Sequence, residues 1–207
     1  QEYVIEWGKQ LCDVLSYLHA QTPPIIYRDM KPSNVMLKPD GNLALIDFGT
    51  AREFKERKVE DTTCLGTVGY AAPEQFGGLG QTDARTDVYG LGATLYHLVT
   101  GLNPGSPPYE MKPIRTVNPR LSSGFEKILL KCTQRNPEDR YQQCFDLRYA
   151  LEHYEEIDER YHRKQKRRLL IFSLALLTSL AFLVGGFWTG RESQKLTSDY
   201  YEQKLDE

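Results

Sequence analysis

The spacing of apolar residues along the chain predicts a mainly helical fold. Over the first twenty residues, apolar side chains such as Val4, Leu11 and Leu18 recur at the intervals that one face of an amphipathic helix requires. Four segments share this kind of spacing and are predicted to be helices: residues 2–20, 83–100, 124–134 and 141–154.

Short apolar runs between the first two helices predict a small amount of β-structure. A turn at residues 39–42, rich in Asp, Gly and Asn, separates two of these runs, as is typical of a hairpin. Residues 50–71 are expected to form a polar loop. Residues 101–123 contain five prolines and no clean period, which predicts an irregular stretch. The predicted strands are residues 25–27, 35–38 and 43–46.

The composition is that of a globular protein, with 40% hydrophobic and 26% charged residues. A formal net charge of -2 gives no indication of a nucleic-acid partner. The histidines share no spacing typical of a metal or catalytic site, so they are expected on helix surfaces or at helix ends. They are His19, His97, His153 and His162.

One segment near the C-terminal end is long, apolar and uncharged. Residues 169–190 contain no Asp, Glu, Lys, Arg or His. As a helix they would extend about 33 Å, which matches a hydrocarbon core of about 30 Å. A buried core helix is the alternative, but core helices are seldom this long without a charge. We therefore expect one transmembrane helix here, with the lipid bilayer as a partner.

The charges that flank this segment predict its orientation. Residues 160–168 carry six Lys and Arg side chains, whereas residues 191–207 carry three, diluted by five acidic residues. Flanks on the cytoplasmic side of a membrane span carry an excess of Lys and Arg, so the basic side is expected in the cytoplasm. With one span, the chain would be a single-pass protein of the cell membrane. Everything before the span would be cytoplasmic, and the C-terminal tail would lie outside.

The candidate chemistry lies on short connections between the predicted strands. Asp29, Lys31 and Asn34 fall within six residues of one another, and Asp47 follows the predicted hairpin. Phosphoryl transfer needs a carboxylate near the attacking hydroxyl, oxygen ligands for magnesium, and a cation for the developing phosphate charge. These four side chains supply each of those groups.

The sequence around these residues resembles the protein kinase family. Residues 28–34 match the catalytic-loop pattern R-D-x-x-x-x-N, residues 47–49 are D-F-G, and residues 72–74 are A-P-E. Asp87 and Arg140 match two further positions of the family pattern. The resemblance implies a mainly α fold: a kinase-like C-terminal lobe with a small β-hairpin region, plus the transmembrane helix.

The resemblance also implies a role for each matched residue of the reaction centre. Asp29 would accept the proton of a substrate hydroxyl, and Lys31 would neutralise charge on the phosphate of ATP. Asn34 and Asp47 would hold Mg²⁺ against ATP, with Mn²⁺ as an alternative metal. Met36 would lie beneath the adenine ring.

Other matched positions are expected to be structural. Glu74 of A-P-E would form a buried ion pair with Arg140, and Asp87 would anchor the catalytic loop. Phe48 of D-F-G would pack against Tyr27. Tyr27 stands where most kinases have His, a replacement that the family tolerates.

The pattern further indicates the substrate class and a means of control. Lys31, two residues after Asp29, and the G-T-x-x-Y sequence that contains Thr67 are typical of kinases that act on Ser and Thr. Thr67 would bridge Asp29 and Lys31. The Arg that precedes Asp29 suggests control by phosphorylation of the activation loop, for which Thr62 and Thr63 are the candidates.

The resemblance covers residues 1 to about 155, and no glycine-rich loop or V-A-I-K-type lysine precedes the catalytic loop. It therefore implies that the N-terminal lobe is missing from this sequence, and that the chain alone would be weak or inactive. The arrangement is similar to that of bacterial membrane-anchored Ser/Thr kinases. The expected organisation is a C-terminal lobe (1–155), a basic juxtamembrane linker (156–168), a transmembrane helix (169–190) and an extracytoplasmic tail (191–207).

Three functional hypotheses remain open at this stage. The first is an ATP- and magnesium-dependent kinase that phosphorylates Ser and Thr of protein substrates, with a homodimer as an analogy from such kinases. The second is a non-catalytic pseudokinase scaffold tethered to the membrane. The third is a truncated product that acts as a membrane decoy.

Overall fold

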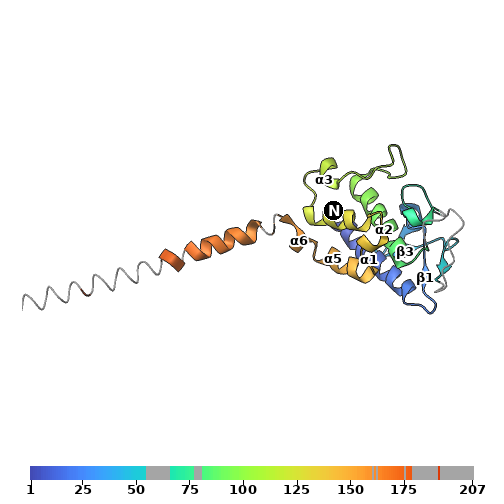
Figure 1. Cartoon of the computed structure of the whole chain (residues 1–207), viewed down its shortest axis with the longest axis horizontal. Coiled ribbons are helices and arrows are strands. Elements are labelled where there is room, and N and C mark those ends of the chain that lie inside the picture. Colours follow the sequence, from blue (N-terminus) through green and yellow to red (C-terminus); the bar gives the residue numbers. More distant parts are fainter. Residues whose placement is uncertain are drawn as a thin grey trace, which may run out of the picture. The chain divides into compact units, whose positions relative to one another are not determined.

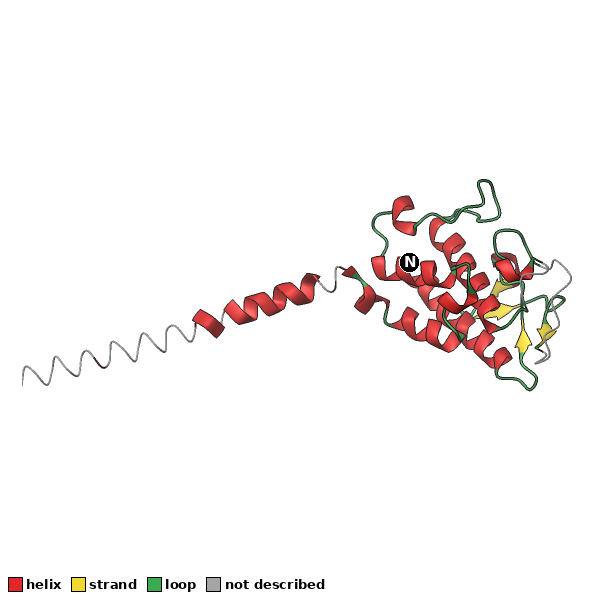
Figure 2. Ribbon diagram, viewed as in Figure 1, coloured by secondary structure: helices red, strands yellow, loops and turns green. Residues whose placement is uncertain are grey.

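The computed structural model of the chain describes residues 1–54, 66–76, 81–159, 161, 163–174, 176–178 and 191. The chain divides into two compact units, Gln1–Glu159 and Arg160–Glu207. The first unit contains the candidate site. In its described part, a small β-region of two antiparallel strand pairs lies at one side of the helices (Figures 1 and 2).

The elements of the first unit agree with a mainly helical fold that contains few strands. The helices in its described ranges are α1 (Glu2–His19), α2 (Ala84–Thr100), α3 (Ile114–Val117), α4 (Ser123–Cys132), α5 (Cys144–Glu152) and α6 (Tyr154–Ile157). The strands are β1 (Ile25–Ile26), β2 (Val35–Leu37), β3 (Leu43–Leu45) and β4 (Arg52–Glu53). Three 3₁₀ turns are η1 (Pro32–Asn34), η2 (Pro73–Gln75) and η3 (Pro137–Asp139).

Helix α2 is the centre of the core, since it contacts α1, α3, α4, α5 and β1. Its buried residues include Val88, Leu91 and Leu95, but also Gly90 and Gly92 on other sides of the helix. The sequence predicted a single apolar face. The helix is instead buried on several faces, because small residues let neighbouring helices approach closely. A Cβ atom built on Gly92 would lie only 2.4 Å from Cβ of Cys132 in α4.

The two ends of α2 are fixed by local hydrogen bonds. The Asp83 carboxylate accepts from the backbone N–H of Arg85, and Thr86 completes a capping box. At the other end Gly101 adopts φ 74°, the left-handed conformation that commonly ends a helix. This start places Asp87 in the first turn, with consequences for the catalytic loop.

Strands β2 and β3 form the predicted hairpin in antiparallel register, with Met36 opposite Ala44. Within the turn, Gly41 adopts φ 84°, and the Asp40 carboxylate accepts from the backbone N–H of Asn42. The hairpin brings the residues just before β2 next to those just after β3. The backbone N–H of Ile46 donates to the carbonyl of Asn34 at 2.9 Å.

Three predictions of secondary structure were incomplete. The polar loop at 50–71 contains β4, which pairs with β1, and the irregular stretch at 101–123 contains α3. Both are too short to show a period in the sequence. The helix expected at 141–154 is confined to Cys144–Glu152. Gln142 lies before its start and donates to the carbonyls of Pro137, Glu138 and Arg140 instead.

The described part of the second unit is helical over residues 163–174 and 176–178. Its apolar side chains, among them Leu169, Leu170 and Phe172, are exposed. Over the residues that the structure describes, no helix has both the length and the apolar character needed to cross a membrane. Most of the predicted span, residues 175 and 179–190, and the tail from 192 onward lie outside the described residues.

Candidate functional site

The loop that carries Asp29 is anchored to α2 through Asp87. The fully buried Asp87 carboxylate accepts from the backbone N–H of Tyr27 at 2.9 Å and of Arg28 at 2.7 Å. The ring of His19 contributes a third hydrogen bond, from Nε2 at 2.8 Å. Three donors and a place in the first turn of a helix compensate this buried negative charge. Asp87 therefore fixes the backbone just before Asp29.

The residue before Asp29 has an uncommon backbone conformation. Arg28 adopts φ 68°, in the left-handed region that non-glycine residues seldom occupy. Its backbone is held from two sides: Asp87 accepts from its N–H, and Nε2 of Gln75 donates to its carbonyl at 2.8 Å. Gln75 itself accepts from the N–H of Ala72 at 2.9 Å. A strained backbone conformation persists where surrounding contacts hold it in place, and these hydrogen bonds hold Arg28.

Asp29, Lys31 and Thr67 form a closed triangle of hydrogen bonds. Nζ of Lys31 lies 2.7 Å from Oδ2 of Asp29 and 2.8 Å from Oγ1 of Thr67. The Thr67 hydroxyl donates to Oδ1 of Asp29 at 3.0 Å. Thr67 thus occupies the bridging position that the sequence predicted for it. The carboxylate of Asp29 is oriented by two side chains from separate segments of the chain.

Asn34 connects this triangle to the hairpin. Its Nδ2 donates to both the backbone carbonyl and Oδ2 of Asp29, each at 2.9 Å. The carbonyl oxygen of the Asn34 side chain therefore remains for another ligand. Asn34 lies directly before β2, and its backbone pairs with Ile46, the residue before Asp47. The hairpin register thus brings Asn34 and Asp47 to the same end of the β2–β3 pair.

Asp47 is exposed and adopts φ 63° at the end of β3. Its Oδ1 accepts from the N–H of Gly49 at 3.0 Å. Next to it, the ring of Phe48 contacts the ring of Tyr27 edge-on, with centroids 5.4 Å apart. The Tyr27 hydroxyl donates to the carbonyl of Ile46 at 2.6 Å, and burial raises the pKa of Tyr27 to about 12. Tyr27 thus stays protonated and ties the catalytic loop to the segment that carries Asp47.

Met36 lies on β2 two residues after Asn34. It is 49% exposed. An exposed, long apolar side chain so close to Asn34 in the sequence would suit the floor of a pocket for an aromatic ring.

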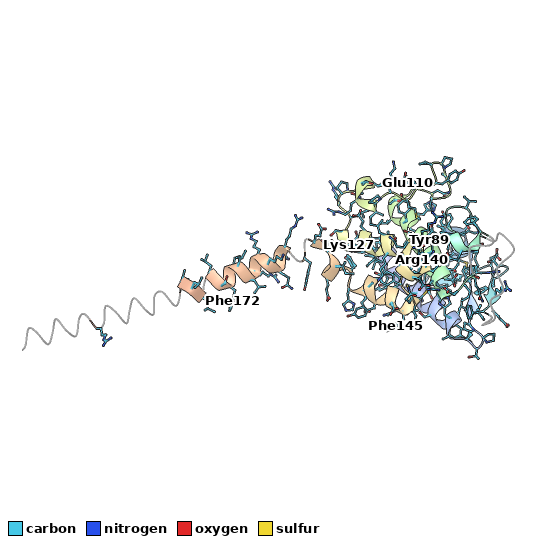
Figure 3. The ribbon with its side chains drawn as sticks, in the orientation of Figure 1. Tyr89, Glu110, Lys127, Arg140, Phe145 and Phe172 are labelled. Carbon is cyan, nitrogen blue, oxygen red and sulfur yellow. The ribbon has the colours of Figure 1, made fainter. Side chains whose placement is uncertain are left out.

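Glu74 and Arg140 form a buried ion pair. Two guanidinium nitrogens of Arg140 lie 2.7 and 2.9 Å from the two oxygens of Glu74. Both side chains are at most 5% exposed. The remaining donors of Arg140 reach backbone carbonyls of α2 and of the segment after α4, and its guanidinium lies 5.0 Å from the centre of the Tyr89 ring (Figure 3). The pair joins η2 to α2 and to the segment that follows α4.

Several positioning residues were not predicted from the sequence. His19, expected on a helix surface or at a helix end, is the last residue of α1, and it lies beside Asp87 with its side chain 11% exposed. His97, with the same expectation, lies in the last turn of α2, and its Nδ1 pairs with the hydroxyl of Tyr70. The place of His19 directly after Leu18, on the apolar side of α1, was the available signal. The phosphorylation candidates Thr62 and Thr63 lie outside the described residues.

The donor set fits a magnesium ion with a nucleotide. Magnesium prefers oxygen ligands, usually one or two from carboxylates together with those of phosphates. Asp47 offers an exposed carboxylate, and Asn34 offers the amide oxygen that Asp29 leaves unused. Both of these candidate ligands, from Asp47 and Asn34, are oxygen atoms, which agrees with a hard cation.

Comparison with known proteins points to one family. A model of the protein kinase domain matches residues 1–153. The chain is 33% identical over 163 residues to the serine/threonine-protein kinase PknF of Mycobacterium tuberculosis, with 69% of this chain and 33% of that protein covered. It is 34% identical over 161 residues to PknB of the same species, with 71% and 25% covered.

A probable serine/threonine-protein kinase of Clostridium acetobutylicum is 30% identical over 156 residues, with 70% of this chain and 23% of that protein covered. The chain therefore spans about a quarter to a third of the length of these bacterial relatives.

Proposed function

The chain belongs to the protein kinase family, and we propose that the protein carrying it transfers the γ-phosphate of ATP to Ser and Thr hydroxyls of proteins. The relatives named above are called serine/threonine-protein kinases, which supports this substrate class. The single observation that carries the proposal is the triangle of Asp29, Lys31 and Thr67. It holds a carboxylate and a cation side by side in a fixed orientation.

Each residue of the triangle has a task in this reaction. A bound Mg²⁺–ATP would supply the phosphoryl group and neutralise part of its charge. Asp29 orients the substrate hydroxyl and accepts its proton, because its carboxylate is already held by Asn34 and Thr67. Lys31, whose ammonium lies between two oxygens, stabilises negative charge that develops on the transferring group.

The remaining residues hold the nucleotide or support the loop. Asn34 and Asp47 would bind magnesium through oxygen atoms, and Met36 would support the adenine ring. Mn²⁺ would suit the same oxygen ligands. Arg140 and Asp87 act through the backbone and packing rather than on the reacting atoms.

We include in the proposal that the 207 residues alone turn over slowly. The sequence before Asp29 contains no glycine-rich loop and no lysine of the V-A-I-K type, which in kinases cover and position the phosphates. Since positioning accounts for most of catalysis in this reaction, the assay belongs on the complete protein that carries this chain.

The substrate class is tested by the product. The complete protein is incubated with γ-labelled ATP, Mg²⁺ and a mixed protein substrate, and the labelled amino acids are separated after acid hydrolysis. We expect phosphoserine and phosphothreonine without phosphotyrosine. Label on tyrosine would contradict the substrate class, and no transfer with either Mg²⁺ or Mn²⁺ would favour the pseudokinase scaffold.

A membrane location is part of the proposal. The uncharged stretch 169–190 and the basic run before it support a single span, with the kinase lobe in the cytoplasm and residues 191–207 outside. The exposure of Leu169, Leu170 and Phe172 is consistent with a lipid-facing helix. Alkaline phosphatase fused after residue 207 should be active in bacterial cells, since it folds outside the cytoplasm. An inactive fusion at normal expression would contradict the orientation.

Control by phosphorylation of Thr62 and Thr63 is the final element. Two copies that phosphorylate each other, as a homodimer, would account for such control. We expect Thr62→Ala with Thr63→Ala to lower turnover of the complete protein. Unchanged turnover together with lost phosphorylation would reject this switch.

A further inference from the structure

A cavity of about 410 Å³ lies away from the Asp29 triangle, at the C-terminal end of α1. Its walls come from α1, β1, the end of β4 and the first turns of α2 and α5. The apolar part of the lining includes Pro24, Ile26, Phe54 and Phe145, of which Phe145 is labelled in Figure 3. This volume is within the range of cavities that bind small molecules, about 300–1,000 Å³.

Two polar side chains on α1 face this space from the same side of the helix. Ser16 and His19 are three residues apart, so they are neighbours on the helix surface, and both line the cavity. No described residue accepts from or donates to the Ser16 hydroxyl. Both side chains are therefore available to a ligand, in addition to the bond that His19 makes with Asp87.

The hydrogen bonds of Asp87 determine which nitrogen of His19 is available. Asp87 accepts from two backbone N–H groups, so its carboxylate is an acceptor and Nε2 of His19 carries the proton. In the neutral ring, Nδ1 is then an acceptor. None of the residues that the structure describes donates to it. With a neutral His19 ring, the cavity thus offers an acceptor for a ligand that carries one donor.

The described part of the lining offers no cation to an anionic ligand. Asp83 lines the cavity, and no Lys or Arg is among the described lining residues. The Asp83 carboxylate is held by Arg85, so a cationic ligand would not find an unpaired charge either. The lining therefore suits a neutral molecule.

We propose that this cavity binds a neutral, largely apolar molecule with a single N–H or O–H donor, which bonds to Nδ1 of His19. Such a ligand stabilises the catalytic loop indirectly, through His19 and Asp87. It fixes the ring of His19, whose Nε2 bonds to Asp87, and Asp87 holds the backbone of Tyr27 and Arg28. The bond between this ligand and His19 needs no bound nucleotide, no metal and no phosphotransfer.

The test uses indole, a neutral bicyclic aromatic with one N–H, and 1-methylindole, which has the same shape without the donor. Binding to the full 207-residue chain is followed by protein NMR. We expect saturable binding of indole, with at least tenfold weaker binding of 1-methylindole. Equal affinities, or no saturable binding of indole up to its solubility limit, would overturn the proposal.

Two substitutions on adjacent residues of α1 locate the site. Ser16→Leu fills part of the cavity and should weaken indole binding at least tenfold. Tyr17→Leu changes the next residue, which is 68% exposed and does not line the cavity, and should leave the affinity within twofold. Equal effects of the two substitutions would place the ligand elsewhere. If Ser16→Leu does not fold, the comparison of the two indoles on the unchanged chain still decides.

The link to the catalytic loop has its own readout. Amide hydrogen exchange at Tyr27 and Arg28 should slow at least threefold when indole saturates the chain, because both amides donate to Asp87. Unchanged exchange at both amides with indole bound would contradict the coupling. Neither result depends on kinase activity, so each can fail while the proposed function stands.

Discussion

Arg140 shows how a single residue can stabilise a buried charge and join separate elements. Its guanidinium bonds to both oxygens of Glu74 and to three backbone carbonyls. Glu74 accepts a further bond from the hydroxyl of Thr86. A buried charge is tolerated when it is paired and its other donors are satisfied, and it becomes costly when one partner is removed.

Replacing Glu74 by Ala should therefore destabilise the folded protein strongly. We expect Glu74→Ala to lower the free energy of unfolding by about 3–5 kcal/mol, since Arg140 would be left buried without a counter-charge. The matched control is Glu138→Ala, because Glu138 pairs with Arg85 while its own side chain is 77% exposed. That change should cost about 0–1 kcal/mol. Urea denaturation followed by circular dichroism gives both values, and similar losses would contradict this account of the pair.

Tyr27 gives a prediction that depends on pH. The pKa of its phenol is raised to about 12 by burial, so the protonated form stabilises the folded state. This contribution is full below the ordinary value of 10.0 and is lost as pH rises toward 12. Tyr27→Phe should lower the unfolding free energy by about 0.5–1.5 kcal/mol at pH 8, because the bond to Ile46 is lost. Between pH 10 and 12 the difference between the two proteins should shrink. A difference that stays constant would show that the phenol does not titrate with folding.

At the scale of elements, the close approach of α2 and α4 requires Gly92. Its missing Cβ would lie 2.4 Å from Cβ of Cys132, closer than side-chain atoms can approach. A Cβ on Gly8 of α1 would meet only the ends of Leu95 and Leu151 side chains, at 3.0 Å. The two glycines thus differ in their neighbours. Cβ of Cys132 is fixed to the backbone of α4, whereas the ends of the leucine side chains can move aside.

We expect Gly92→Ala to destabilise the fold by about 1–3 kcal/mol, because the helices must separate. Gly8→Ala should be nearly neutral, since the gain in helix propensity of about 1 kcal/mol offsets the shift of two flexible leucines. Thermal unfolding of the two variants and the parent measures the contrast. A Gly92→Ala protein as stable as its parent would mean that α2 and α4 are not packed as described.

The elements that show a clear period were predicted from the sequence, and the others could not be. Helix α1 begins and ends within a residue of the predicted 2–20, because its apolar face is regular over five turns. Strand β4, with two residues in a polar loop, is defined only by its pairing with β1. Helix α3 follows a stretch with four prolines and spans four residues, too few for a period.

At the scale of the whole molecule, the candidate site could be located in the sequence, but only part of its support could. Asp29, Asn34 and Asp47 belong to local patterns with short, recognisable spacing. Gln75 is 47 residues from its partner Arg28, and His19 is 68 residues from its partner Asp87, so only the packing of η2, α1 and α2 around the loop reveals these bonds. Contacts between distant segments leave no mark in a local pattern.

The central claim is that Asp29 accepts or orients the proton that leaves the substrate hydroxyl. The most direct test is the turnover number of the complete protein with Asp29→Asn, at saturating Mg²⁺–ATP and protein substrate. Asp40→Asn, an identical change at the exposed turn of the β2–β3 hairpin, is the control. We predict a loss of about 10²–10⁴-fold for Asp29→Asn, as removal of a positioned general base produces, and parent-like turnover for Asp40→Asn. Turnover of Asp29→Asn equal to that of the control would contradict the account.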